Sequence, residues 1–140
     1  MTLLLEPLLP YTPYLALLIR VLVGASLVVH GYPKMGKTGR EQAIGFMKSM
    51  GVPGVAAVLA AILEFFGGFF LIGGFIVPIV ALFLSIQFAA IIVMKKRKMK
   101  AVYISPGKPN YEIDATYLFL CIVMFVLGAG ALSIDGLLGL

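Results

Sequence analysis

Residues 51–94 constrain what this chain can fold into more than any other segment. These 44 residues carry a single charged side chain, that of Glu64. One helix of that length would measure roughly 66 Å, about twice the hydrocarbon thickness of a bilayer. Gly73, Gly74 and Pro78 interrupt the apolar run near its middle, as turn-forming residues do. The segment is therefore expected to form two membrane-spanning helices joined by a very tight turn.

The composition of the whole chain agrees with a membrane location. Of the 140 residues, 61% are hydrophobic and only 12% are charged. Soluble domains contain about 45–50% apolar and about 25% charged residues. A soluble domain of this length would leave large apolar patches exposed to water. The composition therefore excludes an ordinary cytosolic enzyme, a disordered tail and a nucleic-acid-binding domain.

Two further apolar segments flank this central region, so the sequence predicts an all-α membrane protein, a four-helix transmembrane bundle. Pro13 suits the first turn of the first helix, and Pro33 with Gly36 is expected to end it. No segment outside the helices is long enough for a soluble domain, so residues 1–140 are expected to form a single transmembrane domain. The expected spans are residues 14–32, 53–72, 75–94 and 111–132.

The basic residues predict the orientation of the bundle. Ten of the eleven Lys and Arg residues fall within two short segments, residues 33–52 and 95–110. Because Lys and Arg concentrate in cytoplasmic loops, we expect both segments in the cytoplasm and both termini outside the cell membrane. The same charge would also contact anionic lipid headgroups or dock an acidic soluble partner, and the sequence leaves these two alternatives open.

Arg20 and Glu64 are the deepest ionisable residues of the expected spans. Counted from the outer face, they lie roughly 10 and 12 Å deep. Small residues allow helices to approach closely in lipid, so an Arg20–Glu64 ion pair is expected inside the bundle. Such an intramembrane polar centre would be either a structural clamp or part of a ligand or proton path. The small residues on the same helix faces are Ala16, Gly24, Ala56, Ala60 and Gly68.

His30, Glu112 and Asp114 form a second group of candidates, near the inner ends of the first and last spans. If those helices are neighbours, His30 would pair with one of the carboxylates. A histidine in that setting relays protons or binds a quinone carbonyl. The alternative is a hydrogen-bonded histidine at the membrane interface.

Metal and thiol chemistry are disfavoured by residue counts. The sequence contains one histidine, His30, and one cysteine, Cys121. These numbers exclude a multi-histidine metal site, a cysteine cluster and an internal disulfide within one chain. We expect no metal, and we expect Cys121 to be a small apolar filler. Quinone-coupled thiol–disulfide exchange is disfavoured for the same reason.

An ordered set of short motifs resembles the DoxX family of small four-helix membrane proteins, which is related to DoxD-type subunits of thiosulfate:quinone oxidoreductase. The resemblance extends from Arg20 to Asp135. No single motif is specific, but the ordered set is fairly specific. The matching elements are Arg20 with Gly24, His30-Gly31-x-x-Lys34, Phe46 with Gly51-x-Pro53, Glu64 with Gly67-Gly68, Gly73, Glu112 and Ser133-x-Asp135.

The resemblance implies a role in membrane-associated sulfur oxidation or oxidative-stress systems. We therefore expect a non-catalytic membrane subunit of an oxidoreductase system, with no covalently bound cofactor, that contacts quinone and a soluble redox or sulfur-enzyme partner at the basic loops. The chain departs from a full DoxD–DoxA arrangement, because we expect no added soluble domain within these 140 residues, and its loop before the last span is unusually basic. The alternative is a small transporter or lipid-handling bundle built around Arg20 and Glu64.

Overall fold

A computed structural model describes residues 10–139 of the chain. The expected all-α class is confirmed, because residues 10–139 contain no β-strand. The single-domain prediction also covers residues 1–9 and 140, which lie outside the described residues. The helices are α1 (Thr12–Met35), α2 (Lys37–Ser49), α3 (Gly54–Gly73), α4 (Val77–Met99), α5 (Glu112–Leu127) and α6 (Ile134–Leu138).

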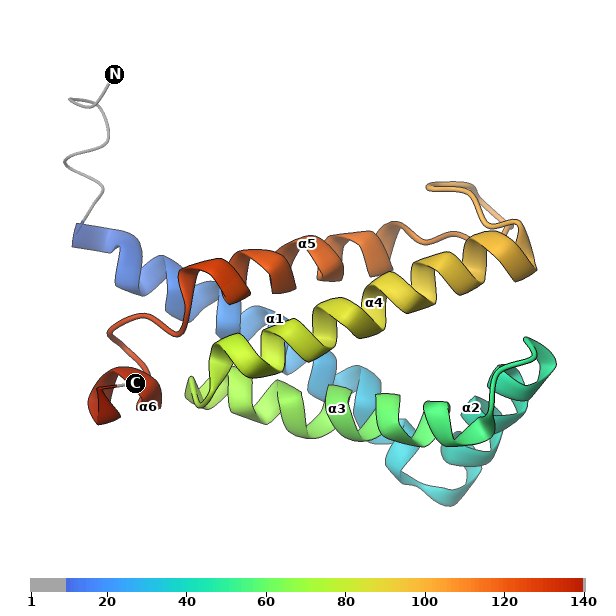
Figure 1. Cartoon of the computed structure of the whole chain (residues 1–140), viewed down its shortest axis with the longest axis horizontal. Coiled ribbons are helices and arrows are strands. Elements are labelled where there is room, and N and C mark those ends of the chain that lie inside the picture. Colours follow the sequence, from blue (N-terminus) through green and yellow to red (C-terminus); the bar gives the residue numbers. More distant parts are fainter. Residues whose placement is uncertain (1–9, 140) are drawn as a thin grey trace.

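Helices α1, α3, α4 and α5 associate as two pairs. Helix α1 packs mainly on α3 and α4 packs mainly on α5, whereas contacts between the pairs are sparser. Figure 1 shows α3 and α4 meeting at a turn and diverging from it. We call the end with this turn (residues 74–76) and α6 the turn end. We call the opposite end, with α2 and the last turn of α4, the basic end.

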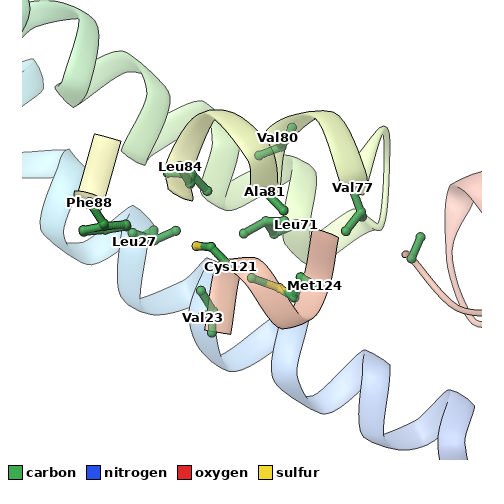
Figure 2. Close-up of a cluster of buried hydrophobic side chains, with 11 residues drawn as sticks. Val23, Leu27, Leu71, Val77, Val80, Ala81, Leu84, Phe88, Cys121 and Met124 are labelled. Atoms are coloured by element: carbon green, nitrogen blue, oxygen red, sulfur yellow. The ribbon is translucent and has the colours of Figure 1, made fainter. Parts of the chain in front are cut away.

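The hydrophobic core fills the turn-end half of the space between the pairs (Figure 2). Its α4 residues all come from the half of that helix that follows the turn. Cys121 is fully buried in this core, as expected of an apolar filler. The cluster comprises Val23, Leu27, Leu71, Val77, Val80, Ala81, Leu84, Phe88, Cys121, Met124 and Ala129.

The expected tight turn between the two central helices is confirmed. Gly74 has a φ of 71° and Ile76 a φ of 45°, so both adopt the left-handed conformation. Glycine adopts this conformation without the steric penalty of a Cβ atom. The chain therefore reverses direction between Gly73, the last residue of α3, and Val77, the first of α4.

The segments expected as basic loops are partly helical. Residues 33–52 contain α2, which packs on α1 and α3. Pro33 does not end the first helix as expected, because α1 continues to Met35 and stops where Gly36 turns extended. A proline this close to the end interrupts little of the helix, because few hydrogen bonds remain beyond it. Helix α4 likewise continues to Met99, so most of the basic run lies on its last turns.

Three of the four expected spans are confirmed as helices long and apolar enough to cross a membrane, namely α1, α3 and α4. The helix predicted over residues 111–132 is shorter, because α5 ends at Leu127. Gly128 and Gly130 follow it with positive φ values of 71° and 75°, which a helix does not continue through. Exposed large apolar side chains on the outer faces suit lipid contact, for example Leu22, Leu59, Phe83 and Phe119.

Candidate functional site

A cavity of about 600 Å³ opens between the two helix pairs at the basic end. Leu27 and Phe88 belong both to its lining and to the hydrophobic core, so the core forms its floor. The other apolar lining comes from all five long helices, including Ala43 and Met47 of α2. Its volume lies within the range of roughly 300–1,000 Å³ that is typical of small-molecule sites.

Glu64 provides a buried carboxylate on the α1–α3 side of this cavity. Its side chain accepts a hydrogen bond from Lys34 Nζ of α1, with which it forms a salt bridge. Gln87 Nε2 of α4 donates to the other oxygen, Oε1, at 2.9 Å. Glu64 is only 4% exposed, and a buried carboxylate is tolerated when its charge and lone pairs are matched in this way.

Asp114 provides a second carboxylate on the opposite, α4–α5 side. Lys95 Nζ of α4 donates to Asp114 Oδ2 of α5, and both residues line the cavity. Each helix pair therefore contains its own lysine–carboxylate salt bridge at the basic end. The four charges sum to zero across the cavity.

An aromatic group connects these two sides. The Tyr117 hydroxyl shares a hydrogen bond with Ser26 Oγ, and its ring stacks on Phe88 with 5.0 Å between centroids. The rings of His30 and Tyr117 are nearly perpendicular, with 6.1 Å between their centroids. His30 and Tyr117 both line the cavity, so two side chains with polar groups lie beside its apolar floor.

The expected pairing of His30 with a carboxylate is wrong. Asp114 lies in the same cavity as His30, but its partner is Lys95. Glu112 is exposed and does not line the cavity. Residues two apart on a helix point roughly 200° apart, so Asp114 and Glu112 cannot share a face.

The expected Arg20–Glu64 ion pair is also wrong. Arg20 is 1% exposed and donates from Nη2 to the carbonyl of Leu132. The charged group that interacts with it electrostatically is Asp135. Arg20 therefore belongs to the turn end, whereas Glu64 belongs to the cavity.

The register of α1 against α3 explains this difference. A Cβ atom at Gly24 would lie 2.6 Å from the Gly68 carbonyl oxygen, so these two glycines face each other directly. The expected close approach of the small-residue faces is thus confirmed. In antiparallel helices, however, Arg20 lies four residues to one side of this contact and Glu64 four residues to the other. Eight residues of helix separate them by about 12 Å along the axis.

Asp135 is a structural residue that sequence analysis names only as part of a motif. Its carboxylate accepts hydrogen bonds from the backbone N–H groups of Ile76 at 2.7 Å and Val77 at 3.0 Å. It thereby caps the N-terminus of α4, where a negative charge also suits the helix dipole. Its own N–H donates to the carbonyl of Gly74 at 2.9 Å, which ties α6 to the turn.

Sequence analysis misses the roles of Lys34, Lys95 and Tyr117. Lys34 follows His30 by four residues, and this spacing alone places both on one helix face. Lys95 lies in a basic run whose charge is already explained by membrane topology, so nothing distinguishes it from its neighbours. Tyr117 follows Asp114 by three residues, which again places the two on one face.

The family model for DoxX matches residues 15–97, more than half of the chain. The chain belongs to the DoxX family. The matched segment includes three of the four charged cavity residues, Lys34, Glu64 and Lys95. The expected resemblance to this family of membrane proteins is thereby confirmed.

Two curated relatives of this DoxX-family protein extend the comparison. The protein named "Putative oxidoreductase CatD" from Bacillus subtilis (strain 168) is 30% identical over 119 residues, which cover 85% of this chain and 83% of the relative. The "Inner membrane protein YqjF" from Escherichia coli (strain K12) is 32% identical over 124 residues, which cover 87% of this chain and 90% of the relative. No solved structure matches the chain.

Proposed function

We propose that this DoxX-family protein is the membrane subunit of a redox system and that its cavity binds a quinone headgroup. One observation carries the proposal: a cavity of about 600 Å³ lies beside helices that are long and apolar enough to cross a membrane, and its lining combines apolar residues with residues that carry hydrogen-bonding groups. A membrane-dissolved ligand with a polar head and an apolar tail suits such a lining. The name of the Bacillus subtilis relative adds support for a redox association.

The charges of the lining favour a neutral headgroup. Glu64 is matched by Lys34, and Asp114 is matched by Lys95. A neutral quinone enters without separating either salt bridge, whereas an added charge would leave one buried charge unmatched. The aromatic side chains of His30 and Tyr117 line the cavity and would contact a flat ring bound there.

A bound quinone would supply two-electron, two-proton chemistry at this site, with the electrons coming from a redox partner. The chain's own residues would bind and orient the head. Tyr117, oriented by Ser26, and His30 would offer hydrogen bonds and exchangeable protons at the cavity wall. Leu27 and Phe88 would exclude water from its floor.

We further propose that the bundle crosses the cell membrane four times, as a single domain with both termini outside. In this arrangement α5 and the segment that follows it, residues 128–133, cross together. The basic end would face the cytoplasm, because residues 33–52 and 95–110 carry ten of the eleven Lys and Arg residues. A soluble redox or sulfur-enzyme partner would dock there.

The alternative, a transporter or lipid-handling bundle built around an Arg20–Glu64 centre, depended on an ion pair between these two residues that the structure does not contain. The two residues bond to different partners at different levels of the bundle. The geometry therefore favours the cavity, rather than a central charge pair, as the functional site.

Extraction of the purified protein tests the proposed function. The protein is purified from membranes in mild detergent, and bound quinone is extracted and quantified per mole of protein. Ala60 lines the cavity, so Ala60→Phe should fill it and remove the quinone. Leu59 is 61% exposed on the adjacent position of α3, so Leu59→Phe is the matched control and should retain the quinone.

Quinone at detergent background in the wild-type protein would reject the proposed site. Equal quinone in the wild-type protein and the Ala60→Phe variant would place it elsewhere on the protein. Proteins that co-purify with the wild type identify the redox partner. Charge reversal at Lys37 and Lys96, which do not line the cavity, should release that partner at unchanged quinone content.

A further inference from the structure

We propose that Lys34 and Lys95 bind the two carbonyl oxygens of the quinone head from opposite walls of the cavity. This inference rests on the proposed function and assigns the two residues that would hold the ligand. Neither lysine lies on the same element as its salt-bridge partner, and the two lysines come from different helix pairs. The two donors therefore reach the cavity lining from different helix pairs.

Both ammonium groups have donor capacity left for a ligand. A lysine ammonium carries three N–H donors, and each salt bridge uses one of them. The side chains of Lys34 and Lys95 remain 34% and 26% exposed, and both line the cavity. Their free donors are therefore accessible from the cavity, while the carboxylates fix the position of each ammonium.

The carboxylates also determine which class of head the lysines accept. Two unpaired lysines would attract a phosphate, but here Glu64 and Asp114 compensate both charges. A quinone presents two neutral acceptor oxygens on opposite sides of its ring, and each accepts a hydrogen bond without displacing a carboxylate. An anionic phospholipid would bring a charge near Glu64 and Asp114, which disfavours it.

A ligand held in this way would connect the two helix pairs. Lys34 belongs to the α1–α3 pair and Lys95 to the α4–α5 pair. These pairs diverge at the basic end, as Figure 1 shows for α3 and α4. The head would add to the two hydrogen bonds that already join the pairs there, Gln87–Glu64 and Tyr117–Ser26. Its binding should therefore raise the thermal stability of the protein.

Equilibrium dialysis against a short-chain ubiquinone tests this inference on full-length protein in detergent. Lys34→Met and Lys95→Met should each weaken binding by about tenfold or more, the effect of losing one hydrogen bond from a charged donor. Lys37→Met and Lys96→Met remove neighbouring lysines that do not line the cavity, so they should leave the dissociation constant within about twofold of wild type.

Lys34→Met also leaves Glu64 buried without its counter-ion, so a second variant separates folding from binding. Lys34→Met combined with Glu64→Gln contains no unmatched charge and should fold, yet it should still bind ubiquinone about tenfold more weakly than the Glu64→Gln variant alone. That single variant keeps the Lys34 donors and should retain binding. The thermal shift produced by ubiquinone should decrease in parallel with affinity.

The outcomes distinguish this inference from the proposed function on which it rests. A wild-type protein that takes up no ubiquinone would reject the proposed function itself. A wild-type protein that binds ubiquinone, with unchanged affinity in both lysine variants, would overturn the inference alone. Competition by phosphatidylglycerol gives a third outcome. If this lipid displaces ubiquinone from the wild-type protein and does not do so in the lysine variants, the lysines bind an anionic lipid and the inference is overturned.

Discussion

Arg20 lies fully buried against the backbone of the α3–α4 turn. A Cβ atom at Gly74 would overlap both Arg20 Nη1 and Ser133 Cβ, so any larger residue there would displace the guanidinium or the turn. The left-handed conformation of Gly74 favours glycine independently. Arg20, Gly74 and Asp135 thus lie together at the turn end, where Asp135 places a negative charge near the buried arginine.

Alanine substitution at Gly74 tests this contact. Gly74→Ala should lower the free energy of unfolding by about 3 kcal/mol, through a left-handed alanine and a steric clash. Gly107 has a φ of 73°, but a Cβ atom added there would meet no other atom within 4 Å. Gly107→Ala therefore isolates the conformational cost at about 1 kcal/mol. Equal losses in the two variants, measured by denaturant titration in detergent, would contradict the contact.

Double-mutant cycles test which partner Arg20 has. Arg20→Leu and Asp135→Asn should show a coupling energy of about 1 kcal/mol or more, because the two side chains interact with each other at the turn end. Arg20→Leu and Glu64→Gln should be additive within about 0.5 kcal/mol, since the two sites are separate. A large coupling in the second cycle, together with none in the first, would restore the ion pair that the sequence alone predicts.

At the scale of helices, local patterns predict more than distant ones. The apolar runs and the Gly73–Gly74 turn depend on neighbouring residues, so the sequence places α1, α3 and α4 close to their observed bounds. It does not determine the register of α1 against α3, because a small-residue face repeats every four residues and Gly24 matches Ala60 as well as Gly68. This shift of two turns separates Arg20 from Glu64.

The candidate site is predictable to a similar extent. His30, Glu64 and Asp114 stand out in the sequence because ionisable residues are rare in apolar helices. Their lysine neighbours do not, because Lys34 and Lys95 lie at helix ends, where basic residues are ordinary topology signals. The role of each lysine depends on which carboxylate it meets on another helix. No local pattern in a single sequence shows which residues of different helices are paired.

Helix α5 gives an element-scale prediction. Its 16 residues extend about 24 Å, less than the roughly 30 Å of hydrocarbon, so in the proposed four-span topology residues 128–133 would complete the crossing. Single cysteines introduced into a Cys121→Ala background at Lys98 and at Leu137 should react with an impermeant thiol reagent from opposite sides of the membrane. Labelling of both positions from the same side would show that α5 does not cross and would remove the fourth span.

At the scale of the whole molecule, two helix pairs meet in a packed core at the turn end and diverge at the basic end. Each pair contains one lysine–carboxylate salt bridge beside the cavity. Asp135 and Arg20 tie the turn end together, so a ligand would reach the cavity from the basic end or laterally from the adjacent lipid leaflet. This division separates the charges that stabilise the turn from the four that line the cavity.

Photoaffinity labelling in native membranes tests the central claim that this cavity is a quinone site. A ubiquinone analogue with a photoreactive group on its ring should label peptides from both helix pairs, near Lys34 and near Tyr117, and excess short-chain ubiquinone should prevent it. The Ala60→Phe variant should lose this labelling, and the Leu59→Phe variant should keep it. Labelling confined to lipid-facing residues, or unchanged in the Ala60→Phe variant, would contradict the account.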